Sequence, residues 1–173
     1  MNSYDATIIA GYIAHRALET GKRLTNLQLQ KILYFLQAYW LKNFDTPLFS
    51  DEIQKWKLGP VVPDVYHEYK VFGSSQISYI PKIFDIDAEN STFKIVNFSP
   101  NMVHDNDRRI LERITDNLSN YSGRELVNIT HEHEPWSKDE KKILSGEMKI
   151  PYDIEEIKAY FKENPEKLEI CNV

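Results

Sequence analysis

One helical segment constrains the fold more than any other part of the chain. Thr25 precedes Gln28 by three residues, the capping-box spacing in which each side chain bonds the other residue's free backbone N–H at a helix start. Apolar residues then recur at helical spacing, at Leu29, Ile32, Leu33, Leu36 and Trp40. This pattern predicts a long helix with one buried apolar face, and it places Gln28, Gln30, Lys31 and Gln37 away from that face.

Further start signals predict helices along most of the chain. Two of the expected helices cover residues 5–20 and 63–72, and a third contains Leu111. Three more are expected to begin near Ser122, Ser137 and Asp153. Ser122 and Ser137 each precede a Glu by three residues, so both are predicted to form capping boxes. Asp153 is predicted to cap the last helix through its own carboxylate.

The β structure is expected to be small. Residues 52–56 alternate as a short strand does, and Gly59-Pro60 favours a turn after it. Between residues 74 and 101, two apolar runs separated by residues 87–91 favour a β-hairpin or a small insertion. We therefore expect a mainly α fold with a small β-hairpin or sheet element, built as a single compact α+β domain over residues 1–163 with a C-terminal tail at 164–173.

Composition excludes several classes of protein. The 173 residues are 42% hydrophobic and 27% charged, which is typical of one globular domain and argues against global disorder. No apolar stretch is long enough to cross a membrane, and the N-terminus lacks a signal-peptide pattern. The single cysteine, Cys171, forms no internal disulfide, so the cytoplasm is the expected location. Because Cys171 is predicted to lie in a frayed tail, we expect no nucleophilic role for it.

Three separated blocks of sequence form an ordered pattern at residues 24–34, 47–66 and 130–136. Their motif positions are Thr25, Leu29, Lys31, Gly59, Pro60, Thr130, His131, Pro135 and Trp136. In this order they resemble the Panacea domain of SocA-like antitoxins and phage-associated GepA-like proteins, over about residues 5–163. The third block departs from the family pattern through the added charge of residues 131–134.

The resemblance implies a bacterial or phage antitoxin that neutralises a cognate toxin by direct binding, without catalysis, cofactor or membrane. The toxin is expected to be the product of the adjacent gene. SocA-like members also deliver their toxin to a cellular protease, so a role as a proteolytic adaptor remains the main alternative. The toxin's identity and the oligomeric state stay open.

Aromatic side chains are the candidates for the toxin-binding surface, because Trp and Tyr often dominate the energy of protein interfaces. The candidates are Tyr34, Tyr39, Trp56, Tyr66 and Tyr69. The sequence does not settle whether Trp56 and Tyr66 belong to the core or to an interface, and for Trp56 the core is favoured, because most large aromatic residues at regular spacing are core residues. The formal net charge of −5 favours a basic protein partner.

Two functions of other classes are weaker alternatives. His131 and His133, with neighbouring glutamates, could form part of a metal-dependent hydrolase, but residues two apart point to different sides of a helix. We therefore expect no metal site. The segment after Thr25 could read DNA bases, with Lys22, Arg23 and Lys31 on phosphates, but the acidic balance of the chain disfavours nucleic acid.

Overall fold

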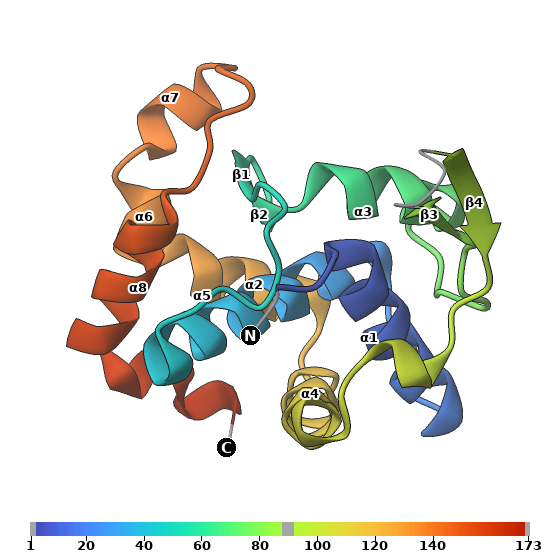
Figure 1. The fold of residues 1–173 in the computed structure, drawn as a ribbon. Coiled ribbons are helices and arrows are strands. Elements are labelled where there is room, and N and C mark those ends of the chain that lie inside the picture. The colour runs from blue at the N-terminus through green and yellow to red at the C-terminus, as the bar shows by residue number, and fades with distance from the viewer. Residues whose placement is uncertain (1–2, 88–91, 172–173) are drawn as a thin grey trace.

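Helix α2 (Asn26–Phe44) runs through the centre of the computed structural model, which describes residues 3–87 and 92–171 (Figure 1). The predicted capping box is confirmed, with the Gln28 side chain accepting a 3.0 Å hydrogen bond from the Thr25 N–H. The prediction of a single buried face is wrong. Gln30, Lys31 and Gln37 are at most 2% exposed, so α2 is buried on its polar side as well.

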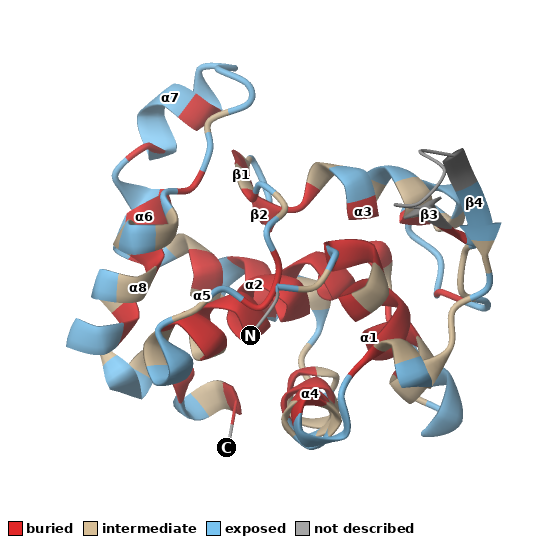
Figure 2. Cartoon of the chain, viewed as in Figure 1, coloured by how far each residue is buried: buried red, intermediate tan, exposed pale blue. Residues whose placement is uncertain are grey.

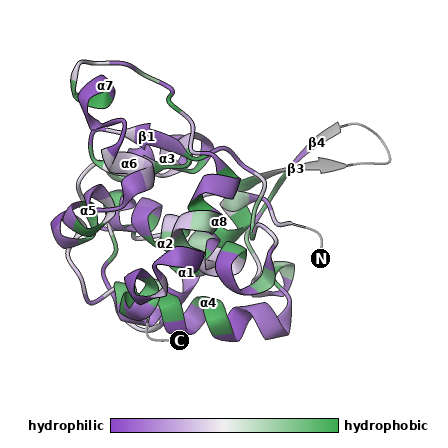
Figure 3. Cartoon of the chain, turned by 90° about the vertical axis from the view of Figure 1, so that its left-hand side faces the viewer, coloured by the Kyte–Doolittle hydropathy of each residue, from purple (hydrophilic) through white to green (hydrophobic). Residues whose placement is uncertain are grey.

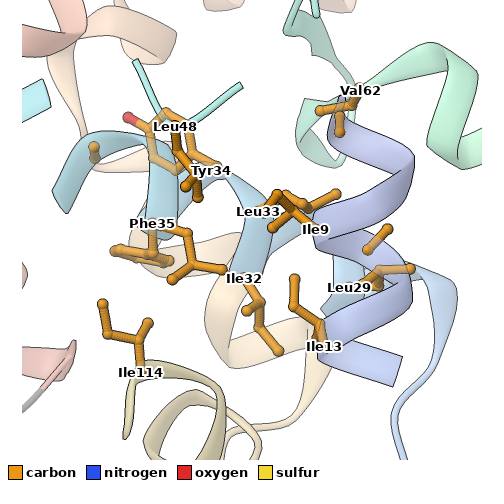
Figure 4. Close-up of a cluster of buried hydrophobic side chains, with 14 of the residues drawn as sticks. Ile9, Ile13, Leu29, Ile32, Leu33, Tyr34, Phe35, Leu48, Val62 and Ile114 are labelled. Carbon is orange, nitrogen blue, oxygen red and sulfur yellow. The ribbon is translucent and has the colours of Figure 1, made fainter. Parts of the chain in front are cut away.

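Five other helices pack around α2 and with one another. They are α1 (Ala6–Glu19), α3 (Pro63–Tyr69), α4 (Asp105–Leu118), α5 (Gly123–His131) and α8 (Ile154–Glu163). In the core, Ile9 and Ile13 of α1 and Ile114 of α4 converge on Phe35 and its neighbours in α2 (Figure 4). Figure 3 shows apolar and polar residues alternating in bands along α4, as expected for a helix with one buried stripe.

Two antiparallel hairpins lie at opposite ends of α3 (Figure 1). The first joins β1 (Gln54–Trp56) to β2 (Gly59–Val61). Gly59 and Pro60 were expected in the turn but belong to β2, where Pro60 lies opposite Lys55. The second joins β3 (Ile83–Asp87) to β4 (Thr92–Val96), which confirms the predicted hairpin, although residues 88–91 lie outside the described part.

The remaining elements are short. They are α6 (Glu134–Ser137), α7 (Glu140–Leu144) and the 3-10 turns η1 (Lys70–Phe72), η2 (Pro100–Met102) and η3 (Pro165–Cys171). The predicted capping box at Ser137 is wrong, because Ser137 ends α6 and Asp139 occupies the N-cap position of α7. The Asp139 carboxylate does not cap the helix; it pairs with Lys55 and Lys142.

The C-terminal segment packs against the body, so the prediction of a frayed tail at Cys171 is wrong. Cys171 is 0% exposed, and its carbonyl accepts a 2.8 Å hydrogen bond from the Asn117 side chain of α4. Burial raises the pKa of the thiol to about 12. The boundary at residue 163 stays a prediction, whereas the mainly α domain with small β elements is confirmed.

The capping boxes give a direct test of these helix starts. Ser122 accepts from the Glu125 N–H and Glu125 accepts from the Ser122 N–H at 2.7 Å, so both predicted bonds exist. We expect Ser122→Ala to lower the free energy of unfolding by about 1 kcal/mol. Ser137→Ala, which removes no cap, should change it by less than about 0.5 kcal/mol. Urea unfolding measures both, and an equal loss in the two variants would contradict the assignment.

Candidate functional site

The three motif blocks meet around one buried amine. Lys31 of α2 is 0% exposed, and its Nζ donates a 2.9 Å hydrogen bond to the carbonyl of Pro60 in β2. Thr130 of α5 and Lys31 both lie close to Gly59, where an added Cβ would come within 2.7 Å of the Thr130 Oγ1 and 3.0 Å of the Lys31 Cε. We call these four residues the Lys31 junction. It joins segments about a hundred positions apart in sequence.

Burial controls the charge of Lys31. Removal of the amine from water lowers its pKa from 10.5 to about 7, because the charged form loses hydration. Among the described residues, no carboxylate forms an ion pair with Lys31. A side chain so enclosed has no route to a substrate or to phosphates, so it holds the β1–β2 hairpin on α2.

Two glutamines of α2 extend the same arrangement along the helix. The Gln30 Oε1 accepts a 2.9 Å hydrogen bond from the Val62 N–H, just before α3. The Gln37 Oε1 accepts from the Leu48 N–H at 2.8 Å, and its Nε2 donates to the Phe49 carbonyl at 2.9 Å. The polar side chains of α2 therefore fix the backbone of the second motif block. Sequence periodicity gave no signal of this role.

The third block closes the site through a ring stack. The rings of His131 and Trp136 lie parallel, with centroids 3.6 Å apart. The Trp136 Nε1 donates a 3.0 Å hydrogen bond to the carbonyl of Trp56 at the end of β1. The pKa of His131 is lowered, first by burial and then by the nearby charge of Lys31. Pro135 is buried beside Trp136, so this block is scaffolding for β1.

His133 lies apart from His131, in the aromatic core. It is 0% exposed, its ring contacts Phe35 and Phe161, and its Nδ1 lies 3.4 Å from the Tyr34 hydroxyl oxygen. Burial lowers its pKa to about 3. Within residues 3–87 and 92–171, no group of three or more His, Cys, Asp or Glu side chains is placed to hold a metal ion.

The structure separates the five aromatic candidates for partner binding. Tyr34 and Tyr69 are each only 1% exposed, so their assignment to a contact surface is corrected: both are core residues. Tyr39 is half-buried and packs against Trp40 within α2. Trp56 and Tyr66 are half-buried neighbours with ring centroids 4.9 Å apart, and we call them the aromatic pair. Only these two come together where a partner can reach them.

Hydrogen bonds with three neighbouring side chains hold the residues of the aromatic pair in place. The Trp56 carbonyl is bonded to Trp136, and the Tyr66 carbonyl accepts a 3.2 Å hydrogen bond from the Asn26 side chain at the start of α2. The Trp56 indole donates to the Gln54 Oε1 at 3.0 Å. Because its indole is hydrogen-bonded, the Trp56 ring loses little conformational freedom on binding, which favours a contact role.

Comparison with known proteins gives one family and one relative. The family model described as "Antitoxin SocA-like, Panacea domain" matches residues 29–137. The chain is 31% identical over 129 residues to "Antitoxin SocA" of Caulobacter vibrioides (strain NA1000 / CB15N), covering 75% of this chain and 66% of that protein. The match thus spans just under two thirds of the relative's length. No solved structure matches the chain. No helix among the described residues has the length and apolar character to span a bilayer.

Proposed function

Because this chain belongs to the SocA-like antitoxin family that is defined by the Panacea domain, we propose that it neutralises a protein toxin by binding it directly. The toxin is the product of the adjacent gene in this proposal. We expect the encounter to take place in the cytoplasm, since a chain with one cysteine needs no oxidising compartment. Binding, rather than catalysis, is the activity.

The half-buried aromatic pair beside the Lys31 junction is the observation that carries this proposal. Trp56 and Tyr66 present two large rings on a rigid support. Lys31 and His133, two side chains that could take part in catalysis, are 0% exposed and are enclosed by the fold. Lys31, one of three cations considered for DNA phosphates, is likewise out of reach. Occlusion of the toxin by a contact surface is the function that fits these residues.

We expect Trp56→Ala and Tyr66→Ala each to weaken toxin binding by at least about ten-fold, a loss of about 1.4 kcal/mol, because a desolvated ring is lost from the interface. Tyr79→Ala is the matched control, since Tyr79 is 53% exposed and packs on Phe72 at the opposite end of α3. Titration calorimetry with the purified adjacent-gene product measures the dissociation constants, and thermal melts report the fold. Unchanged affinity in both ring variants would refute the role of the aromatic pair.

The proteolytic adaptor is distinguished by the fate of the toxin. Occlusion predicts that cells recover growth while the toxin's half-life stays the same with and without this chain. If the toxin's half-life is shortened in the presence of this chain and the shortening depends on a cellular protease, the chain acts by delivering the toxin to that protease and not by occlusion.

A further inference from the structure

Two neighbouring protrusions at one end of the molecule carry exposed apolar side chains. Residues 138–149, which we call the lysine knob, comprise α7 and the loop after it, and they stand away from the helices around α2 (Figures 1 and 2). Within it, Leu144 is 57% exposed and Met148 is 81% exposed. In the β1–β2 turn nearby, Leu58 is 56% exposed. Large apolar side chains gathered on one region of a surface are typical of interaction sites.

Backbone hydrogen bonds hold the two protrusions side by side. The Lys55 N–H of β1 donates to the Ile150 carbonyl at 2.8 Å, and Gln54 forms an antiparallel bridge with Pro151. The chain leaving the lysine knob therefore runs along β1. Deeper in the knob, Asp139 accepts a 2.6 Å hydrogen bond from the buried Lys55 amine. The base of the knob is thus anchored, while its outer residues face solvent.

The charge of this region is opposite to that of the whole chain. The lysine knob and the turn residue Lys57 contain five lysines and three acidic residues, whereas the chain carries a formal net charge of −5. Lys57, Lys141 and Lys149 are exposed and form no ion pair within the part of the chain that the structure describes. Unpaired exposed lysines attract an acidic surface and accelerate the encounter with it.

The region also continues the proposed binding surface. Trp56 of the aromatic pair is followed directly by Lys57 and Leu58 at the tip of the hairpin. The region shared with the family model ends at residue 137, immediately before the knob begins. A protrusion beside a contact surface is placed to distinguish one partner from another.

We infer that the lysine knob and the β1–β2 turn form a second contact area, which selects a toxin whose own binding face is acidic around an apolar centre. This inference rests on the proposed antitoxin function. Leu58, Leu144 and Met148 provide the apolar contact, and Lys57, Lys141 and Lys149 pair with the toxin's carboxylates. A protein partner is favoured over a membrane because the apolar residues lie on a turn and a five-residue helix, which offer no long amphipathic face.

Charge reversal on the lysine knob tests the inference. We expect Lys141→Glu/Lys149→Glu to weaken binding of the purified adjacent-gene product by at least about ten-fold at low salt. The affinity of the unmodified protein should fall between about 50 mM and about 500 mM salt, and that fall should be much smaller in the variant. Leu144→Ser/Met148→Ser should weaken binding without changing the salt dependence. Calorimetry at the two salt concentrations measures all three proteins.

The matched control changes the same residue types elsewhere. Lys70→Glu/Val71→Ser alters an exposed lysine and a 65% exposed apolar residue on η1, and its affinity should stay within about two-fold of the unmodified protein. Unchanged affinity in both knob variants, with Trp56→Ala still impaired, would overturn this inference and leave the antitoxin function intact. Failure of the unmodified protein to bind the adjacent-gene product would overturn the function itself. A further outcome would also overturn the inference. If the unmodified protein sediments with phosphatidylglycerol vesicles, the knob variants do not, and toxin affinity is the same in all of them, then the knob binds a membrane and not the toxin.

Discussion

Replacing Gly59 with alanine is expected to destabilise the protein by about 3 kcal/mol, because two separate penalties act at this position. The backbone of Gly59 has a φ of +90°, a conformation that disfavours a side chain. The new Cβ would also approach the Thr130 Oγ1 to 2.7 Å. The Thr130 hydroxyl has little freedom to move, since it donates a 2.9 Å hydrogen bond to the Val127 carbonyl.

A second glycine separates the two penalties. Gly146 has a φ of +99°, close to that of Gly59, but an added Cβ there meets nothing within 4 Å. Gly146→Ala should therefore cost only the backbone strain, about 1 kcal/mol. The cost of Gly59→Ala should also fall by at least about 1 kcal/mol in a Thr130→Ala background, where the crowded oxygen is absent. Equal losses at both glycines, measured by urea unfolding, would show that the junction is not tightly packed.

The buried Lys31 amine should make the protein more stable as the pH rises above 7. Its pKa is about 7 in the folded chain and 10.5 as the ordinary value, so between these limits the unfolded chain holds a proton that the folded chain lacks. The free energy of unfolding then increases with pH, by at most about 1.4 kcal/mol per pH unit. Below about pH 7 both states hold the proton and this contribution becomes constant.

Lys31→Met should abolish the rise of the unfolding free energy with pH, whatever the substitution does to stability at any single pH. The useful window runs from about pH 7 to about pH 8.5, because the buried Cys171 thiol, with a pKa raised to about 12, removes stability above its ordinary value of 9.0. Gln37→Met is the control on the same helix: it removes buried hydrogen bonds without removing a titrating group, so it should lower stability yet keep the slope. A slope that survives in Lys31→Met would refute the buried amine as its source.

Features set by neighbouring residues were predictable from sequence. The helix starts at Thr25, Ser122 and Asp153 depend on side chains that bond backbone groups two or three positions away, and all three form as expected. The same spacing at Ser137 failed because Ser137 is the last residue of α6, so it cannot be the N-cap of the next helix. Asp139 holds the N-cap position of α7, and its carboxylate forms a 2.6 Å ion pair with Lys55.

The candidate site depends on long-range packing, which periodicity does not encode. Gln37 and Lys31 occupy the polar positions of α2, so an amphipathic pattern places them in solvent. In the structure the loop and hairpin of residues 47–62 cover that side of the helix and use the two side chains as backbone partners. Tyr34 and Trp56 are both aromatic residues within the motif blocks, but Tyr34 is buried in the core whereas Trp56 is half-buried. The family resemblance identified the motif blocks, but only the fold showed which of their residues are buried scaffolding and which can contact a partner.

Growth of cells that express the adjacent-gene product tests the central claim most directly. The unmodified chain should restore growth, and a Trp56→Ala/Tyr66→Ala chain with the same melting temperature and the same cellular level should not. Full rescue by that double variant, or no rescue by the unmodified chain, would contradict neutralisation through this surface.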